Sequence, residues 1–115
     1  MARYKLDGAK IEEGPLGTPS APGAVNTSIY TAPIQGAKDI ELTVSNTAGT
    51  AGSFRVWRVP SGSSVATATN LKYDVPIAAN AGMPVWVGSL HYGDAIWVYG
   101  SANTIAFSLT GKAFT

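Results

Sequence analysis

The sequence between residues 71 and 82 reads Leu71-Lys72-Tyr73-Asp74-Val75-Pro76-Ile77-Ala78-Ala79-Asn80-Ala81-Gly82. Apolar side chains alternate with polar or prolyl ones over its first seven residues. This period of two predicts a β-strand with one buried and one solvent-facing side. The segment 78–82 then predicts a turn, because Asn and Gly tolerate a positive φ. Strand followed by turn is the pattern from which the rest of the fold can be predicted.

The same plan repeats along most of the chain, with turns rich in Gly, Ala, Ser and Thr between short alternating segments. About seven or eight strands of this kind, without helical periodicity, predict an all-β fold. We expect a single antiparallel β-sandwich or jelly-roll-like barrel. The expected strands are 26–31, 38–46, 53–59, 71–77, 83–87, 95–99 and 104–110.

Three of these strands carry further information. In Lys38–Asn46 the side chains of Ile40, Leu42 and Val44 share one face, which we expect to point inward. Ser53–Val59 has apolar groups on both faces, which predicts partial burial on both sides. Pro84 favours an edge or strand-start position for 83–87, since it cannot donate to a ladder.

Residues 1–25 are predicted to form an extended N-terminal arm, and residues 26–115 the sandwich domain. Gly14–Gly23 holds three Pro and three Gly, which predicts neither a helix nor a central strand. Two alternatives remain for the arm: a disordered tail, or a segment that orders against a neighbouring subunit. The apolar Tyr4, Leu6 and Ile11 keep the second alternative open, because a short strand here is able to join a sheet edge.

Composition narrows the class of protein. Charged residues make up 13% of the chain and the net charge is +1, so nothing favours nucleic acid or an anionic membrane as a partner. No Cys is present, and no apolar run approaches a membrane span. No apolar leader follows Met1, so we expect assembly in a cytoplasm. Six of the 15 charges lie within the first 13 residues, and the charge-poor remainder suits a surface covered by partners.

The sequence favours neither an enzyme nor a cofactor or metal site. His91 is the single histidine, and although Asp94 follows it closely, no nucleophile motif accompanies the two. One His, no Cys and scattered acids do not supply a zinc or calcium ligand set. The three Trp residues lie opposite the apolar stripes of their strands. Three alternatives remain for Trp57, Trp86 and Trp97: packing, a subunit or partner interface, and a sugar-stacking platform.

Several strand and turn segments of this sequence also resemble those of a known protein family. They are Ile29-Tyr30-Thr31-Ala32-Pro33, Ser53-Phe54-Arg55-Val56-Trp57-Arg58-Val59-Pro60-Ser61-Gly62, Tyr73-Asp74-Val75-Pro76-Ile77-Ala78-Ala79-Asn80, Gly93-Asp94-Ala95-Ile96-Trp97-Val98-Tyr99 and the Phe107…Gly111 ending. From Ile29 onward the chain resembles a family of small virion proteins of tailed phages. None of the matching residues is catalytic, and the Arg3–Gly23 arm departs from the family pattern.

The resemblance implies an all-β capsid cement or decoration protein that binds the outer capsid surface of the virion and stabilises the shell. The implied partners are the major capsid protein and further copies of the chain, as a homotrimer, with no nucleic acid or membrane. The alternative is a neck or tail-associated module that binds a receptor or glycan. The residues expected at capsid or subunit contacts are Tyr4, Leu6, Ile11, Arg55, Arg58 and Trp86.

Overall fold

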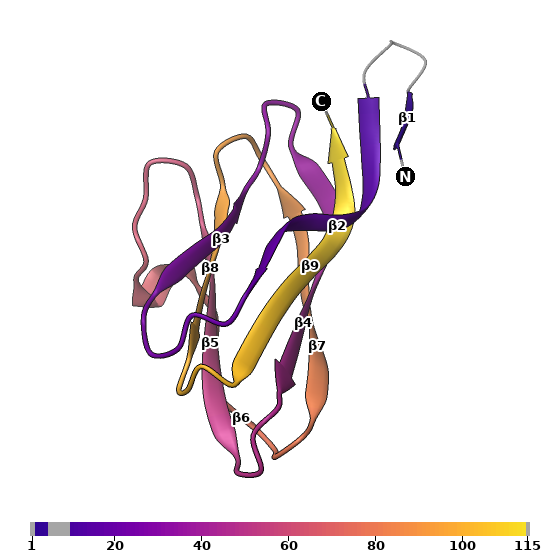
Figure 1. Ribbon diagram of the computed structural model, residues 1–115. Coiled ribbons are helices and arrows are strands. Elements are labelled where there is room, and N and C mark those ends of the chain that lie inside the picture. Colours follow the sequence, from indigo (N-terminus) through magenta and orange to yellow (C-terminus); the bar gives the residue numbers. More distant parts are fainter. Residues whose placement is uncertain (1, 5–9, 115) are drawn as a thin grey trace.

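The computed structural model describes the backbone of residues 2–4 and 10–114 and the side chains of residues 13–114. Within these ranges the chain forms nine strands and one short 3-10 helix, arranged as two antiparallel sheets (Figure 1). The elements are β1 (Ala2–Tyr4), β2 (Lys10–Ser20), β3 (Thr27–Thr31), β4 (Ala37–Asn46), β5 (Gly52–Val59), η1 (Thr67–Thr69), β6 (Asn70–Ile77), β7 (Gly82–Leu90), β8 (Ala95–Gly100) and β9 (Ile105–Phe114).

The strand order is that of a jelly roll. One sheet runs β1-β2-β9-β4-β7 and the other β3-β8-β5-β6. Apart from the short β1, the first of the eight strands pairs with the last, the second with the next to last, and so on inward. A long hairpin rolled into two facing sheets gives this pattern. The predicted all-β sandwich or jelly roll is therefore confirmed.

The core lies between the two sheets and uses the inward faces that strand periodicity predicts. Ile40, Leu42 and Val44 of β4 are fully buried, as expected. Phe54 of β5 meets Phe107 of β9 edge to face across the gap, with ring centroids 6.2 Å apart. The remaining buried members of this core are Leu16, Ala32, Ala37, Val56, Ile77, Val85, Val87, Leu90, Ile96, Val98, Ile105, Leu109 and Ala113.

Strand β6 corrects one expectation about its faces. Leu71–Ile77 does form a strand, but it is the outermost strand of its sheet, and Tyr73 is 56% exposed instead of buried. The pairs Phe54↔Val75 and Val56↔Lys72 leave two β6 residues opposite one residue of β5. This β-bulge interrupts the period of two, so the tyrosine turns outward.

The sequence predicts neither a helix nor a central strand over residues 14–23, and the strand that the structure forms there is outermost in its sheet beyond residue 12. Residues up to Ser20 belong to β2, which pairs with β9 and places Leu16 opposite Leu109 in the core. Pro15 is accommodated because β1 pairs only with residues 10–12, so the outer side of β2 is free of β1 beyond them. Leu6 lies outside the described residues, as do the side chains of Tyr4 and Ile11.

Strand β7 confirms the edge position that Pro84 predicts for this strand. It is the outermost strand of the five-stranded sheet, and Pro84 lies opposite Thr43 of β4. The strand is longer than the predicted range 83–87, because β7 runs from Gly82 to Leu90. Val85 and Val87 point into the core, so the residue between them points to solvent.

Candidate functional site

The predicted contact residues with described side chains lie in three separate places. Arg55 is on the outer face of the four-stranded sheet, where it is half-buried. Arg58 reaches from β5 to the other sheet. Trp86 is 63% exposed on the outer face of the five-stranded sheet. The structure therefore does not join these three residues into one site.

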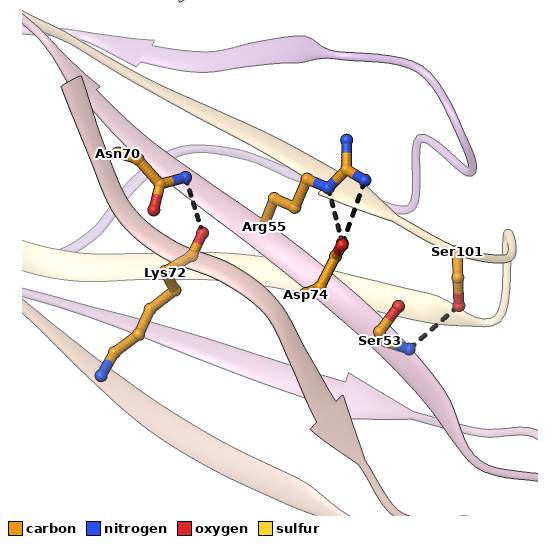
Figure 2. A network of polar contacts seen from close by, with 6 residues as sticks. All are labelled: Ser53, Arg55, Asn70, Lys72, Asp74 and Ser101. Carbon is orange, nitrogen blue, oxygen red and sulfur yellow. Dashed lines mark hydrogen bonds and ion pairs between the residues drawn. The ribbon is translucent and has the colours of Figure 1, made fainter. Parts of the chain in front are cut away.

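Arg55 is held by groups of its own sheet (Figure 2). Its Nε donates to Asp74 Oδ1 at 2.6 Å and its Nη2 donates to Asp74 Oδ2 at 3.3 Å. The guanidinium also lies between two aromatic rings, 4.2 Å from the centroid of Tyr73 and 4.5 Å from that of Tyr99. The hydrogen bond to Asp74 raises the pKa of Arg55 above its ordinary value. The cluster binds β5, β6 and β8 to one another.

Arg58 ties the two sheets together. Its Nη1 donates to the carbonyl oxygens of Val87 and Ser89, both at 3.4 Å, on β7 of the facing sheet. The guanidinium thereby supplies hydrogen-bond donors to backbone carbonyl groups of β7, the outermost strand of its sheet. Arg58 thus has a structural contact within the chain, whatever else it binds.

The three Trp side chains differ in environment. Trp57 is 4% exposed but lies outside the inter-sheet core, on the outer side of β5, which η1 contacts. Packing is therefore the correct alternative for Trp57. Its cross-strand neighbour Trp97 is half-buried. Trp86 alone of the three has most of its surface in solvent.

An apolar surface that sequence reasoning missed lies at one end of the sandwich, where the loop before β4 meets the turn after β7. Ile34 is 76% exposed and Tyr92 is 63% exposed. With Pro33 and Gln35 they line a cleft of about 410 Å³. An adjoining cleft of about 260 Å³ shares Ile34, Gln35 and Tyr92 and includes Phe114. We call the surface around these two clefts the apolar end; isolated apolar residues in turns have no periodicity that would reveal it.

The carboxylate of Asp94 holds the turn after β7, and a close backbone approach at Gly36 holds the loop before β4. The amide of His91 donates to Asp94 Oδ2 at 3.0 Å, and the amide of Ser61 donates to Asp94 Oδ1 at 3.0 Å. The carboxylate of Asp94 therefore caps backbone groups of two loops. Gly36, with φ 78°, brings the other loop so close that a Cβ there would lie 2.7 Å from the carbonyl oxygen of Leu90.

Neither a metal-ligand cluster nor a membrane-spanning helix is found among the described residues. No group of three or more His, Cys, Asp or Glu side chains gathers there in a way that suits a metal ion. No helix in the described part of the chain has the length and apolar character needed to cross a membrane.

Comparisons with known proteins show no family for this chain. No family model matches it, and no curated protein matches it. Among solved structures, the chain is similar to one from the infectious bursal disease virus Gx strain, with a TM-score of 0.44 and 8% sequence identity. The likeness covers 92% of this chain and 31% of that chain.

Proposed function

We propose that the protein is a structural component of a virion, and more specifically a capsid cement or decoration protein of a tailed phage. In this proposal it binds the outer surface of the shell, with the major capsid protein and further copies of itself, as a homotrimer, as partners. The observation that carries the proposal is the apolar end, where Ile34 and Tyr92 expose large side chains around adjoining clefts. Exposed apolar surface of this kind marks a site of protein contact.

The N-terminal segment enters the molecule beside the apolar end. Phe114 lines one of the clefts and lies opposite Ile11 at the start of β2. Figure 1 accordingly shows β1 and the first part of β2 next to the C-terminal end of β9. An N-terminal arm next to an exposed apolar surface suits a protein that binds across the boundary between two shell subunits. Many equivalent contacts of modest strength stabilise a shell by mass action.

The test is occupancy of the shell by variants of the apolar end. Ile34→Ser combined with Tyr92→Ser removes the apolar contact, and we expect this variant to be depleted from purified virions, measured by quantitative mass spectrometry. Val25→Ser is the matched control, since Val25 is 63% exposed and its loop contacts the β8–β9 end of the molecule through Gly23. Unchanged occupancy of the double variant would refute docking through the apolar end.

Arg55 and Arg58 are less suitable for this test. Both guanidinium groups already bind within the chain, so an Ala change at either residue alters the fold's own contacts together with any docking contact. Truncation of the arm before residue 10 is the better second variant, because it leaves the described pairing of β2 with β9 in place.

Copy number separates the cement reading from the neck or tail alternative. We expect the chain to approach parity with the major capsid protein in purified virions. A copy number that is a small fraction of the shell subunit would contradict the cement proposal and favour a neck or tail location.

A further inference from the structure

The outer face of the five-stranded sheet presents an ordered row of four exposed residues. Trp86 of β7 lies opposite Glu41 of β4, Glu41 lies opposite Thr110 of β9, and Thr110 lies opposite Pro15 of β2. We call these four residues the Trp86 row. Neighbouring strands are about 4.8 Å apart, so Trp86 and Thr110 are separated by about 10 Å across the sheet.

The next positions along the same strands carry small uncharged residues. Pro84, Thr43 and Ser108 form the second row across β7, β4 and β9, and Gly82, Ser45 and Ala106 form the third. Across these three rows of described residues, Glu41 is the one charged side chain. These three rows are therefore rich in hydroxyl groups and carry one charge, whereas the adjoining row on the other side of the Trp86 row holds Glu13, Lys112 and Lys38.

The indole of Trp86 leans along its own strand. Its Nε1 lies 3.6 Å from the point where a Cβ on Gly88 would stand, and the glycine has φ 91° at a β-bulge. The absence of a side chain at Gly88 leaves room for the ring beside the strand. One side of an exposed aromatic ring is thereby offered to solvent, where its electron-rich face attracts partly positive C–H groups.

Glu41 supplies a hydrogen-bond acceptor next to this ring. Its carboxylate is exposed and has no hydrogen bond or ion pair with any residue that the structure describes. Lys112, the nearest cation on β9, lies 3.3 Å from Asp39 in an ion pair. A carboxylate that is not neutralised accepts strong hydrogen bonds from hydroxyl donors.

We propose that the Trp86 row binds a neutral saccharide. A pyranose ring lies against the indole of Trp86 through its C–H face, and hydroxyl groups of the same or the next sugar unit donate to the carboxylate of Glu41. The hydroxyl of Thr110 offers a further donor or acceptor along the row. This inference is independent of the proposed shell contact, which uses the apolar end.

Charge argues against the other occupants of such a face. An anionic glycan or a nucleic acid would bring negative charge to Glu41, and the three rows hold no cation to offset it. The two lysines of the adjoining row, Lys38 and Lys112, lie beside two acids, Glu13 and Asp39. A second copy of the chain packed face to face about a two-fold axis would bring two Glu41 carboxylates into one interface without a cation in these rows. A neutral ligand with hydroxyl donors brings no second negative charge to Glu41, so it avoids both of these repulsions.

The experiment titrates the full chain, labelled with nitrogen-15, with four neutral disaccharides and one anionic one. The neutral probes are maltose, cellobiose, lactose and diacetylchitobiose, and the anionic probe is digalacturonate. We expect at least one neutral probe to shift the amide signals of residues 41, 86 and 110 in a saturable way, and digalacturonate to leave them unchanged. Trp86→Ala should weaken binding at least about tenfold, as truncation of a central Trp contact usually does, and Glu41→Gln should weaken it less.

The control is Tyr92→Ala, which removes an aromatic side chain of the same 63% exposure from the apolar end and should bind the sugar as the unaltered chain does. The proposal is overturned if no neutral probe shifts these signals, or if the shifts persist in Trp86→Ala. It is also overturned if Trp86→Ala changes only the sedimentation of the protein, which would identify the face as a contact between copies. Loss of shell occupancy in the apolar-end variant leaves this result unaffected, so the two proposals fail separately.

Discussion

The guanidinium of Arg55 donates two hydrogen bonds to the carboxylate of Asp74, at 2.6 and 3.3 Å, and Asp74 itself has a backbone φ of 50°. The backbone of a non-glycine residue is rarely in this left-handed region. Asp74 is one of the two β6 residues that lie opposite the single residue Arg55 in the bulge. The ion pair therefore joins β5 to β6 at the same β-bulge that turns Tyr73 outward.

Substitutions at Asp74 should separate the backbone conformation from the ion pair. Asp74→Asn keeps an oxygen acceptor and a residue type that tolerates a left-handed backbone, so it should be the mildest change. Asp74→Ala loses the acceptor and should cost about 1 kcal/mol more for its backbone conformation alone. Urea denaturation measures the difference. If the Ala variant is as stable as the Asn variant, the bulge does not depend on this residue.

Asn46 is the buried polar side chain that joins the loops at one end of the sandwich. It is 3% exposed, its Nδ2 donates to the carbonyls of Thr50 and Ala78, and its Oδ1 accepts from the amide of Ala48 and the hydroxyl of Thr104. Asn46→Ala leaves these partners unsatisfied and should lower the free energy of unfolding by about 2–4 kcal/mol.

The matched control for Asn46 is the half-buried Asn70, whose Nδ2 donates to the carbonyl of Lys72 at 3.0 Å (Figure 2). Asn70→Ala should cost about 1 kcal/mol or less, because water replaces this bond. Equal losses of stability in the two variants, measured by urea denaturation, would show that Asn46 has no special role in holding the loops.

Asn46→Asp makes the same site depend on pH. The carboxylate that it introduces would face the carbonyl oxygens of Thr50 and Ala78 in a buried position, which raises the pKa of the new group in the folded state. The folded state then binds more protons than the unfolded chain, so the variant should become more stable as pH falls from 7 towards about 4. Thermal melts of the variant and the unaltered protein across this range give the difference, and a parallel pH dependence of the two would contradict it.

The strands could be predicted from the sequence because alternation decides which face of a strand is buried. The pattern of Ile40, Leu42 and Val44 required nothing beyond the period of two. Alternation does not decide which strand pairs with which, so the jelly-roll order came from the structure. The bulge at Asp74 and the strand over Pro15 escaped prediction, since both depend on what the neighbouring strand leaves unpaired.

The candidate surfaces, too, could be predicted from the sequence only in part. Trp86 could be placed on the outer face from its neighbours in β7, but its alignment with Glu41 depends on strand register, which no local pattern contains. Ile34 and Tyr92 lie in turns, and only the packing of two distant loops brings them together.

Trp57 and Trp86 should differ sharply in what they contribute to stability. Trp57 is 4% exposed, and Trp57→Ala should cost about 3–5 kcal/mol because it leaves a cavity on the outer side of β5. Trp86 is 63% exposed, and Trp86→Ala should change stability by no more than about 0.5 kcal/mol. Chemical denaturation checks both values. A large loss in Trp86→Ala would mean that its ring supports the fold, and sugar binding by that variant would then need to be measured below its unfolding range.

Two glycines of β2 test whether this strand is an integral part of the sandwich. Gly14 has φ 115° with open space around it, whereas Gly17 has φ 64° and a Cβ there would lie 2.6 Å from the carbonyl oxygen of Ile29. Gly14→Ala should therefore cost only the backbone term, about 1 kcal/mol. Gly17→Ala adds a clash with the backbone of β3 that cannot be relieved by a side-chain rotation, so its total should be about 2–3 kcal/mol. Urea denaturation of the two variants gives the comparison. If they lose the same stability, β2 does not press against β3, and residues 14–20 behave as part of the extended N-terminal arm predicted over residues 1–25.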